Sequence, residues 1–183
     1  MLFRSSTLTQ LDISSNRIGN SGTEAICKAL QSNHVMTHLN LGGNTIGDSG
    51  ADALAGALEW SGTQLSYLQL VGCKITSHGV EALARALRTN RSLLYLNLEG
   101  TNVACSATAL AETLQSNQTL TYLGLTNNNI KNKAAIQLAQ TLQDKNDTLA
   151  YLDLGRNRIG AKGKAELELV DRERCVIDLR HQN

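Results

Sequence analysis

The chain has 183 residues, which is enough for one domain of ordinary size. Its hydrophobic content of 42% supports a continuous core, and because aromatic residues make up only 3%, that core must consist mainly of aliphatic side chains. The formal net charge of +1 provides no long-range attraction to nucleic acid or to an anionic membrane, so we predict neither partner.

The cysteines indicate a reducing compartment. They occupy positions 27, 73, 105 and 175, and no two of them form the CxxC spacing of a zinc or redox site. The first residues lack the apolar stretch of a signal peptide, and no apolar run reaches the roughly 18 residues of a membrane span. We therefore expect a cytoplasmic protein without disulfides, metal or membrane segment.

The chain begins in the middle of a repeating pattern. Residues 1–8 align with residues 86–93, so Leu2 takes the place of Leu87, the last leucine of a predicted helix. We expect residues 1–7 to be the remnant of a preceding helix, which suggests a fragment of a longer array. An uncapped first repeat would allow end-to-end pairing of two chains.

From residue 11 onward the pattern Leu-x-Leu-x-x-Asn-x-Ile recurs six times. The first leucine of each copy lies 28, 29, 28, 27 and 29 residues after the previous one. These leucines are Leu11, Leu39, Leu68, Leu96, Leu123 and Leu152. A period in this range is typical of a solenoid, in which each unit buries its apolar face only against its neighbours.

The second copy illustrates the unit. Residues 36–41 alternate apolar and polar side chains, which predicts a strand with one buried face. Residues 42–47 are rich in glycine and asparagine and predict a turn. Asp48 or Ser49 then has the side chain of a helix N-cap, and an Ala/Leu stripe at residues 53–58 predicts a helix.

Stacking such units gives a curved slab. Parallel strands lie about 4.8 Å apart, whereas helices pack about 8–10 Å apart, so the helical side must be the longer one. We predict an α/β fold, a right-handed horseshoe-shaped solenoid of six repeats, with a parallel β-sheet on the concave face and helices on the convex face. It would form a single domain over residues 1–183.

Some copies depart from the pattern. Cys73 and Thr101 replace the loop asparagine, and we interpret both as structural substitutions that make weaker loop hydrogen bonds. Residues 101–107 and 128–134 lack glycine in the turn before the helix, which indicates either sequence drift or an irregular rim where a partner binds. Trp60 follows the second helix and either packs over the next helix end or forms a second contact site.

After the sixth repeat, residues 171–174 are all charged, and residues 176–179 predict a short seventh strand. We expect residues 170–183 to form a cap-like C-terminal segment.

The outward strand positions form columns across the predicted sheet. The column before the first strand leucine holds Gln10, His38, Tyr67, Tyr95, Tyr122 and Tyr151, which include all four tyrosines of the chain. Tyrosine favours strands and also suits interface anchors, so this column has a structural interpretation and a binding interpretation that are compatible. His38 heads the column as a polar strand residue.

The outward columns contain three carboxylates, those of Asp12, Glu99 and Asp153, and no lysine or arginine within the six repeats. A groove for nucleic acid would need cations to meet the phosphates. We predict instead a protein-binding surface in which the tyrosines are flanked by Gln69, Asn97, Glu99 and Asp153.

The full repeat, Leu-x-x-Leu-x-Leu-x-x-Asn-x-Ile-Gly-x-x-Gly-x-x-Ala-Leu-Ala-x-Ala-Leu, resembles the ribonuclease-inhibitor-like subclass of leucine-rich repeats. Similar repeats occur in NOD-like receptors, Ran GTPase-activating proteins and actin-regulatory scaffolds. The resemblance covers residues 2–179. It implies the solenoid fold but does not identify a partner, because this fold serves many.

For function, no phosphate loop, nucleophile elbow or convergent set of acids is present, so we predict neither catalytic residues, cofactor nor metal ligands. The leading prediction is a non-catalytic protein-interaction scaffold. Two alternatives are a regulatory module for an enzyme, of the GTPase-activating or inhibitor-like kind, and a sensor or autoinhibitory segment of a larger NOD-like receptor.

Overall fold

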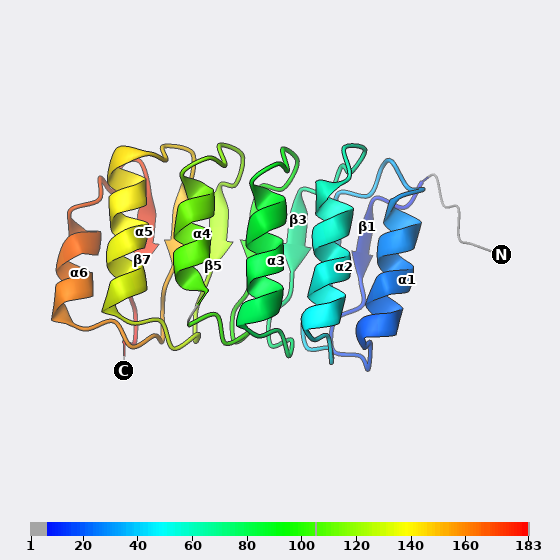
Figure 1. Ribbon diagram of the computed structural model, residues 1–183, viewed down its shortest axis with the longest axis horizontal. Helices are drawn as coiled ribbons and strands as arrows, with labels where there is room; N and C mark the ends of the chain where they lie inside the picture. Colours follow the sequence, from blue (N-terminus) through cyan, green and yellow to red (C-terminus); the bar gives the residue numbers. More distant parts are fainter. Residues whose placement is uncertain (1–6, 105, 183) are drawn as a thin grey trace.

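The computed structural model describes residues 7–104 and 106–182 (Figure 1). Seven strands of three residues each form one parallel sheet, and their order in the sheet follows their order in the chain. They are β1 (Gln10–Asp12), β2 (His38–Asn40), β3 (Tyr67–Gln69), β4 (Tyr95–Asn97), β5 (Tyr122–Gly124), β6 (Tyr151–Asp153) and β7 (Val176–Asp178). The predicted helical remnant at residues 1–7 lies, except for residue 7, outside the described residues.

A helix follows each of the first six strands, and the helices form one layer that covers one face of the sheet (Figure 1). They are α1 (Asn20–Leu30), α2 (Asp48–Glu59), α3 (Ser77–Leu87), α4 (Ala107–Leu114), α5 (Asn132–Asp144) and α6 (Ala161–Glu168). Because helices need about twice the lateral spacing of strands, the uncovered face of the sheet is the concave one. This confirms the predicted solenoid.

The core lies between the sheet and the helices. The central leucine of each strand from β2 to β6 has no solvent-exposed area, and the second leucine of each of these copies is equally buried. Isoleucine or valine after each loop asparagine position returns to the same layer, as Ile46 and Val103 do with 0% exposure. The register pairs each leucine with the leucine of the next copy, so the repeats share one continuous aliphatic core.

The loop asparagines join consecutive repeats by hydrogen bonds. The Oδ1 atom of Asn128 accepts from the backbone amides of Thr101 and Val103 in the preceding repeat, at 3.0 and 3.1 Å. Its Nδ2 atom donates to the carbonyl oxygens of Leu98 and Thr126, at 2.8 and 3.1 Å. Asn44 and Asn157 make equivalent bonds. We call this series the loop asparagine ladder.

Cys73 and Thr101 stand in this ladder as structural substitutions. The Thr101 hydroxyl donates to the Leu98 carbonyl at 2.7 Å, and the Cys73 thiol lies 3.5 Å from the Leu41 carbonyl. Cys73 is 3% exposed, and burial raises the pKa of its thiol. Each residue therefore keeps a hydrogen bond to a loop carbonyl, although neither offers the amide's combination of two donors and a carbonyl acceptor.

The predicted N-cap at Asp48 or Ser49 is wrong. The N-cap position of α2 is Gly47, and Asp48 lies inside the helix. Its carboxylate caps the next helix instead, because Oδ1 accepts from the amides of Thr76 and Gly79 at 2.7 and 3.1 Å. Asn20 and Asn132 cap the turns that begin α2 and α6 in the same way. Helix capping therefore acts between repeats rather than within them.

A second series of asparagines, which was not predicted from the sequence, occupies four of the six described loops that lead from a helix to the next strand: Asn33, Asn90, Asn117 and Asn146. Asn117 donates to the carbonyl of Leu87 at 2.7 Å, and its Oδ1 accepts from the amides of Thr119 and Leu120. Asn90 and Asn146 make the same set of bonds. Both loop edges of the solenoid are thus tied together by buried amides.

Trp60 lies beside the loop of the preceding repeat, and its packing over the next helix end stays a prediction. It closes α2 and its ring lies 5.3 Å from the ring of His34, which belongs to the preceding loop. A Cβ atom at Gly62 would lie 2.3 Å from the indole, so the glycine allows the ring to fold back over its own turn. The chain's one tryptophan is half-buried in this position.

The seventh strand continues the pattern beyond α6. β7 pairs with β6 in parallel, as predicted for residues 176–179. Gln182 extends the loop asparagine ladder: its Nε2 donates to the Leu154 carbonyl at 2.7 Å, and its Oε1 accepts from the Ile159 amide at 3.3 Å. The longer glutamine side chain thereby makes the bonds that an asparagine makes in the earlier copies.

Candidate functional site

The four tyrosines form a continuous stack on the concave face. Consecutive ring centroids lie 4.2 Å apart for Tyr67 and Tyr95, 4.2 Å for Tyr95 and Tyr122, and 5.3 Å for Tyr122 and Tyr151. The interplanar angles are 10–12°. The His38 ring extends the stack at 5.3 Å from Tyr67. We call this set the tyrosine ladder.

The register of the sheet dictates this ladder. Parallel pairing places Tyr67 beside Tyr95, Tyr95 beside Tyr122 and Tyr122 beside Tyr151, so a strand spacing of about 4.8 Å sets the ring spacing. All four rings are half-buried. The ring faces cover one another, whereas the ring edges and hydroxyls border the concave surface.

The flanking polar side chains serve the fold as well as the surface. The Gln69 side chain accepts a hydrogen bond from the Tyr67 hydroxyl. Asn97 and Asp153 each accept from the backbone amide two residues ahead, at 2.9 and 3.0 Å. Such side-chain turns at the strand ends explain why short amides and carboxylates occupy this column.

Glu99 differs from these neighbours. Its side chain is half-buried, and its carboxylate forms no hydrogen bond or ion pair with the residues that the structure describes. Of the predicted surface residues, the tyrosines and His38 therefore form one contiguous stack. Gln69, Asn97 and Asp153 border that stack while making internal bonds, and Glu99 alone presents an uncommitted carboxylate.

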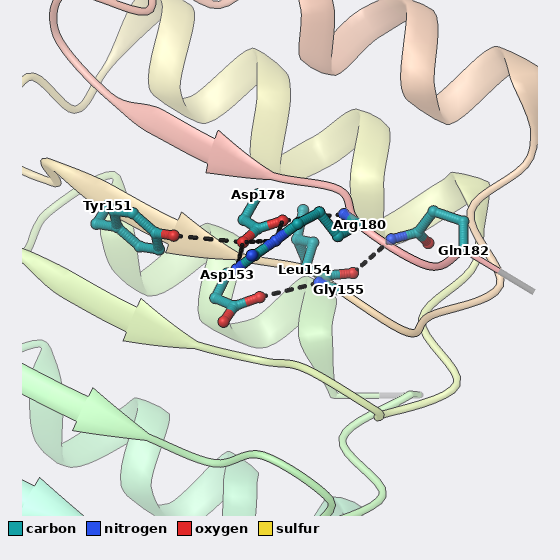
Figure 2. Close-up of polar contacts among 7 residues, drawn as sticks. All are labelled: Tyr151, Asp153, Leu154, Gly155, Asp178, Arg180 and Gln182. Carbon is teal, nitrogen blue, oxygen red and sulfur yellow. Dashed lines mark hydrogen bonds and ion pairs between the residues drawn. The ribbon is translucent and has the colours of Figure 1, made fainter.

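A recess that was not predicted from the sequence lies at the C-terminal end of this face. It has a volume of about 290 Å³ and lies where two small residues, Thr126 and Gly155, follow β5 and β6. Glu99 lines one side, and Asp178 and Arg180 line the other. Figure 2 shows the arginine side of this recess.

Arg180 is engaged by Asp178. The arginine Nε atom donates to both carboxylate oxygens at 3.0 and 2.8 Å, and Nη2 lies 2.6 Å from Oδ2 (Figure 2). This arginine holds the pKa of the Asp178 carboxyl below its ordinary value. The Tyr151 hydroxyl donates to the same carboxylate at 3.4 Å. The end of the tyrosine ladder is thus connected to the recess.

Burial raises the pKa of three tyrosines of the ladder, Tyr67, Tyr122 and Tyr151. The pKa of Tyr67 rises to about 12, chiefly because burial disfavours the phenolate and then because Tyr95 adjoins it. Burial also raises the pKa of Tyr122 and of Tyr151, and the charge of Asp153 adds to both effects. At these three positions the folded protein therefore favours the protonated phenol.

This shift predicts a loss of stability in alkali. Below pH 10 the Tyr67 phenol is protonated in both states, so its contribution is fully present. Between pH 10 and about 12 the unfolded chain releases the proton while the folded chain retains it, so the free energy of unfolding falls as pH rises. Tyrosinate absorbance during titration of folded and urea-unfolded protein measures the difference; coincident curves would contradict the assignment.

The two irregular turns have different geometries. Ser106 precedes α4, and its buried hydroxyl donates to the Val103 carbonyl at 2.9 Å. Residue 105, within the predicted rim at 101–107, lies outside the described residues. At 128–134, α5 begins at Asn132 after an extended Lys131. The binding role of this rim stays a prediction.

In the described part of the chain, no group of three or more histidine, cysteine or acidic side chains converges in a way that could hold a metal ion. Within the same residues, no helix has the length and apolar character needed to span a bilayer. Cys27, Cys73 and Cys175 are buried and unpaired, and burial raises the pKa of the Cys175 thiol to about 11.

Comparison with known proteins agrees with this architecture. A family model described as "Leucine Rich repeat" matches residues 4–27, 32–55, 63–84, 116–139 and 145–164. The ribonuclease inhibitor of Sus scrofa is 31% identical over 103 residues, which is 56% of this chain. The matched region is 16% of that relative, so the chain spans a small part of its length.

Solved structures share the fold. Actin-binding site 2 of leiomodin-1 superimposes with a TM-score of 0.66 at 22% identity, covering 75% of this chain and 80% of that one. The tropomodulin C-terminal domain of Caenorhabditis elegans gives a TM-score of 0.64 at 15% identity, covering 76% of this chain and 85% of that one. At these identities the similarity concerns the fold alone.

Proposed function

This chain belongs to the leucine-rich repeat family, in its ribonuclease-inhibitor-like subclass, and from that premise we propose that it is a non-catalytic scaffold that binds a protein partner on its concave face. The observation that carries the proposal is the tyrosine ladder. It places four half-buried phenol rings in one row, with their edges and hydroxyls toward the open face of the sheet.

The ladder has the physical properties of an interface anchor. Each tyrosine offers a large contact area, and stacking at 4.2–5.3 Å already fixes its ring, so little side-chain entropy remains to be lost on binding. The sheet beneath is held by a fully buried leucine column and by the loop asparagine ladder. A partner therefore meets a preformed surface.

We assign the central contact to Tyr95 and Tyr122, with Tyr67 and Tyr151 beside them. Interface hot spots concentrate at the centre of a contact and are rich in tyrosine. The polar border of Gln69, Asn97, Glu99 and Asp153, together with His38, would supply hydrogen bonds at the rim. The structure adds, among the described residues, no side chain that favours the enzyme-regulating or receptor-segment alternatives.

The test is a double substitution, Tyr95→Ala with Tyr122→Ala. We expect it to weaken binding of a partner isolated with the wild-type chain by at least about 100-fold, because two central anchors are removed. The partner is first captured from cells that produce the protein, and its affinity is then measured with purified components. Far-ultraviolet circular dichroism checks that the variant remains folded.

Two control variants identify the cause. The pair Tyr95→Phe with Tyr122→Phe keeps the rings and should retain most of the affinity if ring contact dominates. The pair Gln115→Ala with Gln140→Ala alters exposed positions on the helical side and should have no effect. If the alanine pair at the tyrosines binds as tightly as wild type, the concave-face proposal is wrong.

A further inference from the structure

The recess beside the tyrosine ladder has unequal charge on its two sides. On the β7 side, the guanidinium of Arg180 forms an ion pair with Asp178 and donates hydrogen bonds to both of its carboxylate oxygens. On the β4 side, the Glu99 carboxylate faces the recess without a partner among the described residues. Asp153 lies between them and uses one carboxylate oxygen for the Gly155 amide, at 3.0 Å.

A buried polar atom beneath the recess has no hydrogen-bond partner among the described residues. This atom is Oγ1 of Thr126. Backbone pairing places Glu99, Thr126, Gly155 and Arg180 in one row of the sheet. The two middle residues of this row, Thr126 and Gly155, are small, so the surface is hollow between the two long side chains at its ends. The hollow therefore offers the Glu99 carboxylate and the second carboxylate oxygen of Asp153 as free acceptors.

The lining is acidic in net terms. Three carboxylates face two guanidiniums, those of Arg180 and Arg156. Arg156 is exposed at the rim, where it forms no ion pair with the described residues. Elsewhere on the concave columns of the described strands, the further carboxylate is that of Asp12, at the far end of the sheet. The face as a whole is thus complementary to a cation.

We propose that this recess seats an arginine or lysine side chain of the partner polypeptide, held between Glu99 and Asp153 above the Thr126 hydroxyl. Strands β4 and β6 lie two strand spacings apart, about 9.6 Å, which leaves room for a guanidinium or ammonium group to contact both carboxylates. The proposal rests on the proposed function, because it names the chemistry of the partner that the ladder binds.

A polypeptide fits better than a free cation because the recess continues the ladder. Asp153 lies two residues after Tyr151, and the Tyr151 hydroxyl reaches the Asp178 side of the recess. A partner segment lying along the ring edges would therefore end at the recess and could insert one side chain. The ladder would supply contact area, and the recess would supply charge and direction.

The test begins with a displayed library of random short peptides, selected on the immobilised full chain. We expect the enriched peptides to share an arginine or lysine. Replacing that residue with glutamine should weaken binding to wild type roughly tenfold. The same replacement should have little effect on a chain carrying Glu99→Gln and Asp153→Asn. Such coupling between the two changes shows direct contact.

The protein changes are chosen to keep the fold. Asparagine at 153 retains the bond to the Gly155 amide, because Asn40 and Asn97 make the equivalent bond at their own strand ends. Asp12→Asn is the matched control. It alters a concave carboxylate near the opposite end of the sheet and should leave peptide affinity unchanged.

Each outcome decides the proposal. Peptides that need the tyrosines but lack a basic residue, or that show no coupling to the carboxylates, overturn the recess proposal and leave the proposed function standing. Peptides insensitive to Tyr95→Ala with Tyr122→Ala count against both. A selection that enriches no peptide also overturns the recess proposal. So does spermidine binding to the recess as tightly as the peptides do, because that would show a site for free cations.

Discussion

Replacing Asn128 with alanine is expected to lower the free energy of unfolding by about 3–5 kcal/mol. Asn128 is 0% exposed, and its side chain makes four hydrogen bonds to backbone groups of two repeats. Alanine would leave the amides of Thr101 and Val103 buried without their acceptor. An unsatisfied buried amide costs about 1–3 kcal/mol, so the loss exceeds that of an ordinary hydrogen bond.

Asn16 provides the matched control. It occupies the same position in the first repeat, but it is exposed and donates only to the carbonyls of Ile13 and Ser14. Water can replace these bonds, so Asn16→Ala should cost about 1 kcal/mol or less. Urea unfolding followed by circular dichroism measures both changes. Equal losses at the two positions would show that the contacts between repeats add nothing.

A rescue variant tests the mechanism further. Asn128→Thr should recover part of the loss, because Thr101 shows that a hydroxyl at this position can donate to a loop carbonyl, at 2.7 Å. It should not recover all of it, since one hydroxyl is not expected to serve two amides of the preceding repeat and two carbonyls as the Asn128 side chain does. A threonine variant less stable than the alanine variant would contradict this explanation.

The fold was predictable because each repeat carries a period-two strand and an Ala/Leu helix at a constant interval. Once the leucines are aligned, parallel pairing alone places Tyr67, Tyr95, Tyr122 and Tyr151 side by side. Local pattern and global register agree, which is the condition under which sequence reasoning succeeds. That this ladder binds a partner stays a prediction.

Contacts that cross from one repeat to the next were harder to foresee. Asp48 has the side chain of an N-cap and directly precedes a helical stripe, so local reasoning assigns it to its own helix. The lateral distance between turns, which the sequence does not specify, brings it to α3 instead. The second asparagine series did leave a signal, since Asn90, Asn117 and Asn146 recur at the repeat interval.

The recess was not foreseen because it depends on residues beyond the sixth repeat. Arg180 follows β7, and its position beside Gly155 comes from the last strand pairing. Sequence columns drawn over six repeats contained no cation, and the seventh adds one that is tied to Asp178. Small residues such as Thr126 and Gly155 also give no pattern that marks a hollow.

The same crossing contacts explain why glycine opens some helices. A Cβ atom at Gly79 would lie 2.7 Å from the Asp48 Oδ1 atom and 2.8 Å from both the Ala51 Cβ and an Ile75 methyl. Gly50 and Gly163 face the capping side chains of Asn20 and Asn132 in the same way, at 3.0 and 2.9 Å. An isoleucine methyl of the same repeat also lies 2.6 Å from such a Cβ at Gly50 and 2.7 Å at Gly163, so glycine leaves room for both the isoleucine and the Asn or Asp cap of the neighbouring repeat.

The fourth copy lacks this glycine. It is one residue shorter than the third copy between the loop and the end of the helix, and α4 begins with Ala107. The residue of the third copy that corresponds to Asp48 is Ser77, whose side chain is shorter than that of Asn or Asp. The loss of glycine in the fourth copy therefore goes together with the loss of the long cap.

Gly79→Ala is accordingly expected to lower the free energy of unfolding by about 2–4 kcal/mol, since it combines overpacking of about 1–3 kcal/mol with a displaced cap of about 1 kcal/mol. Gly56→Ala is the control with the opposite sign. No atom lies within 4 Å of a Cβ built there on exposed α2, so alanine should stabilise the helix by about 0.5–1 kcal/mol.

The decisive variant combines Gly79→Ala with Asp48→Ser, which gives the capping position the shorter side chain that Ser77 has one repeat later. If the carboxylate of Asp48 is what excludes a methyl group at 79, the double variant should lose less unfolding free energy than the two single variants lose together. The expected difference, which is the coupling energy, is about 1–2 kcal/mol. Thermal and urea unfolding of all four proteins measure this coupling. Strict additivity would mean that Ala51 and Ile75 alone exclude the methyl group, and the link between cap and glycine would then be coincidental.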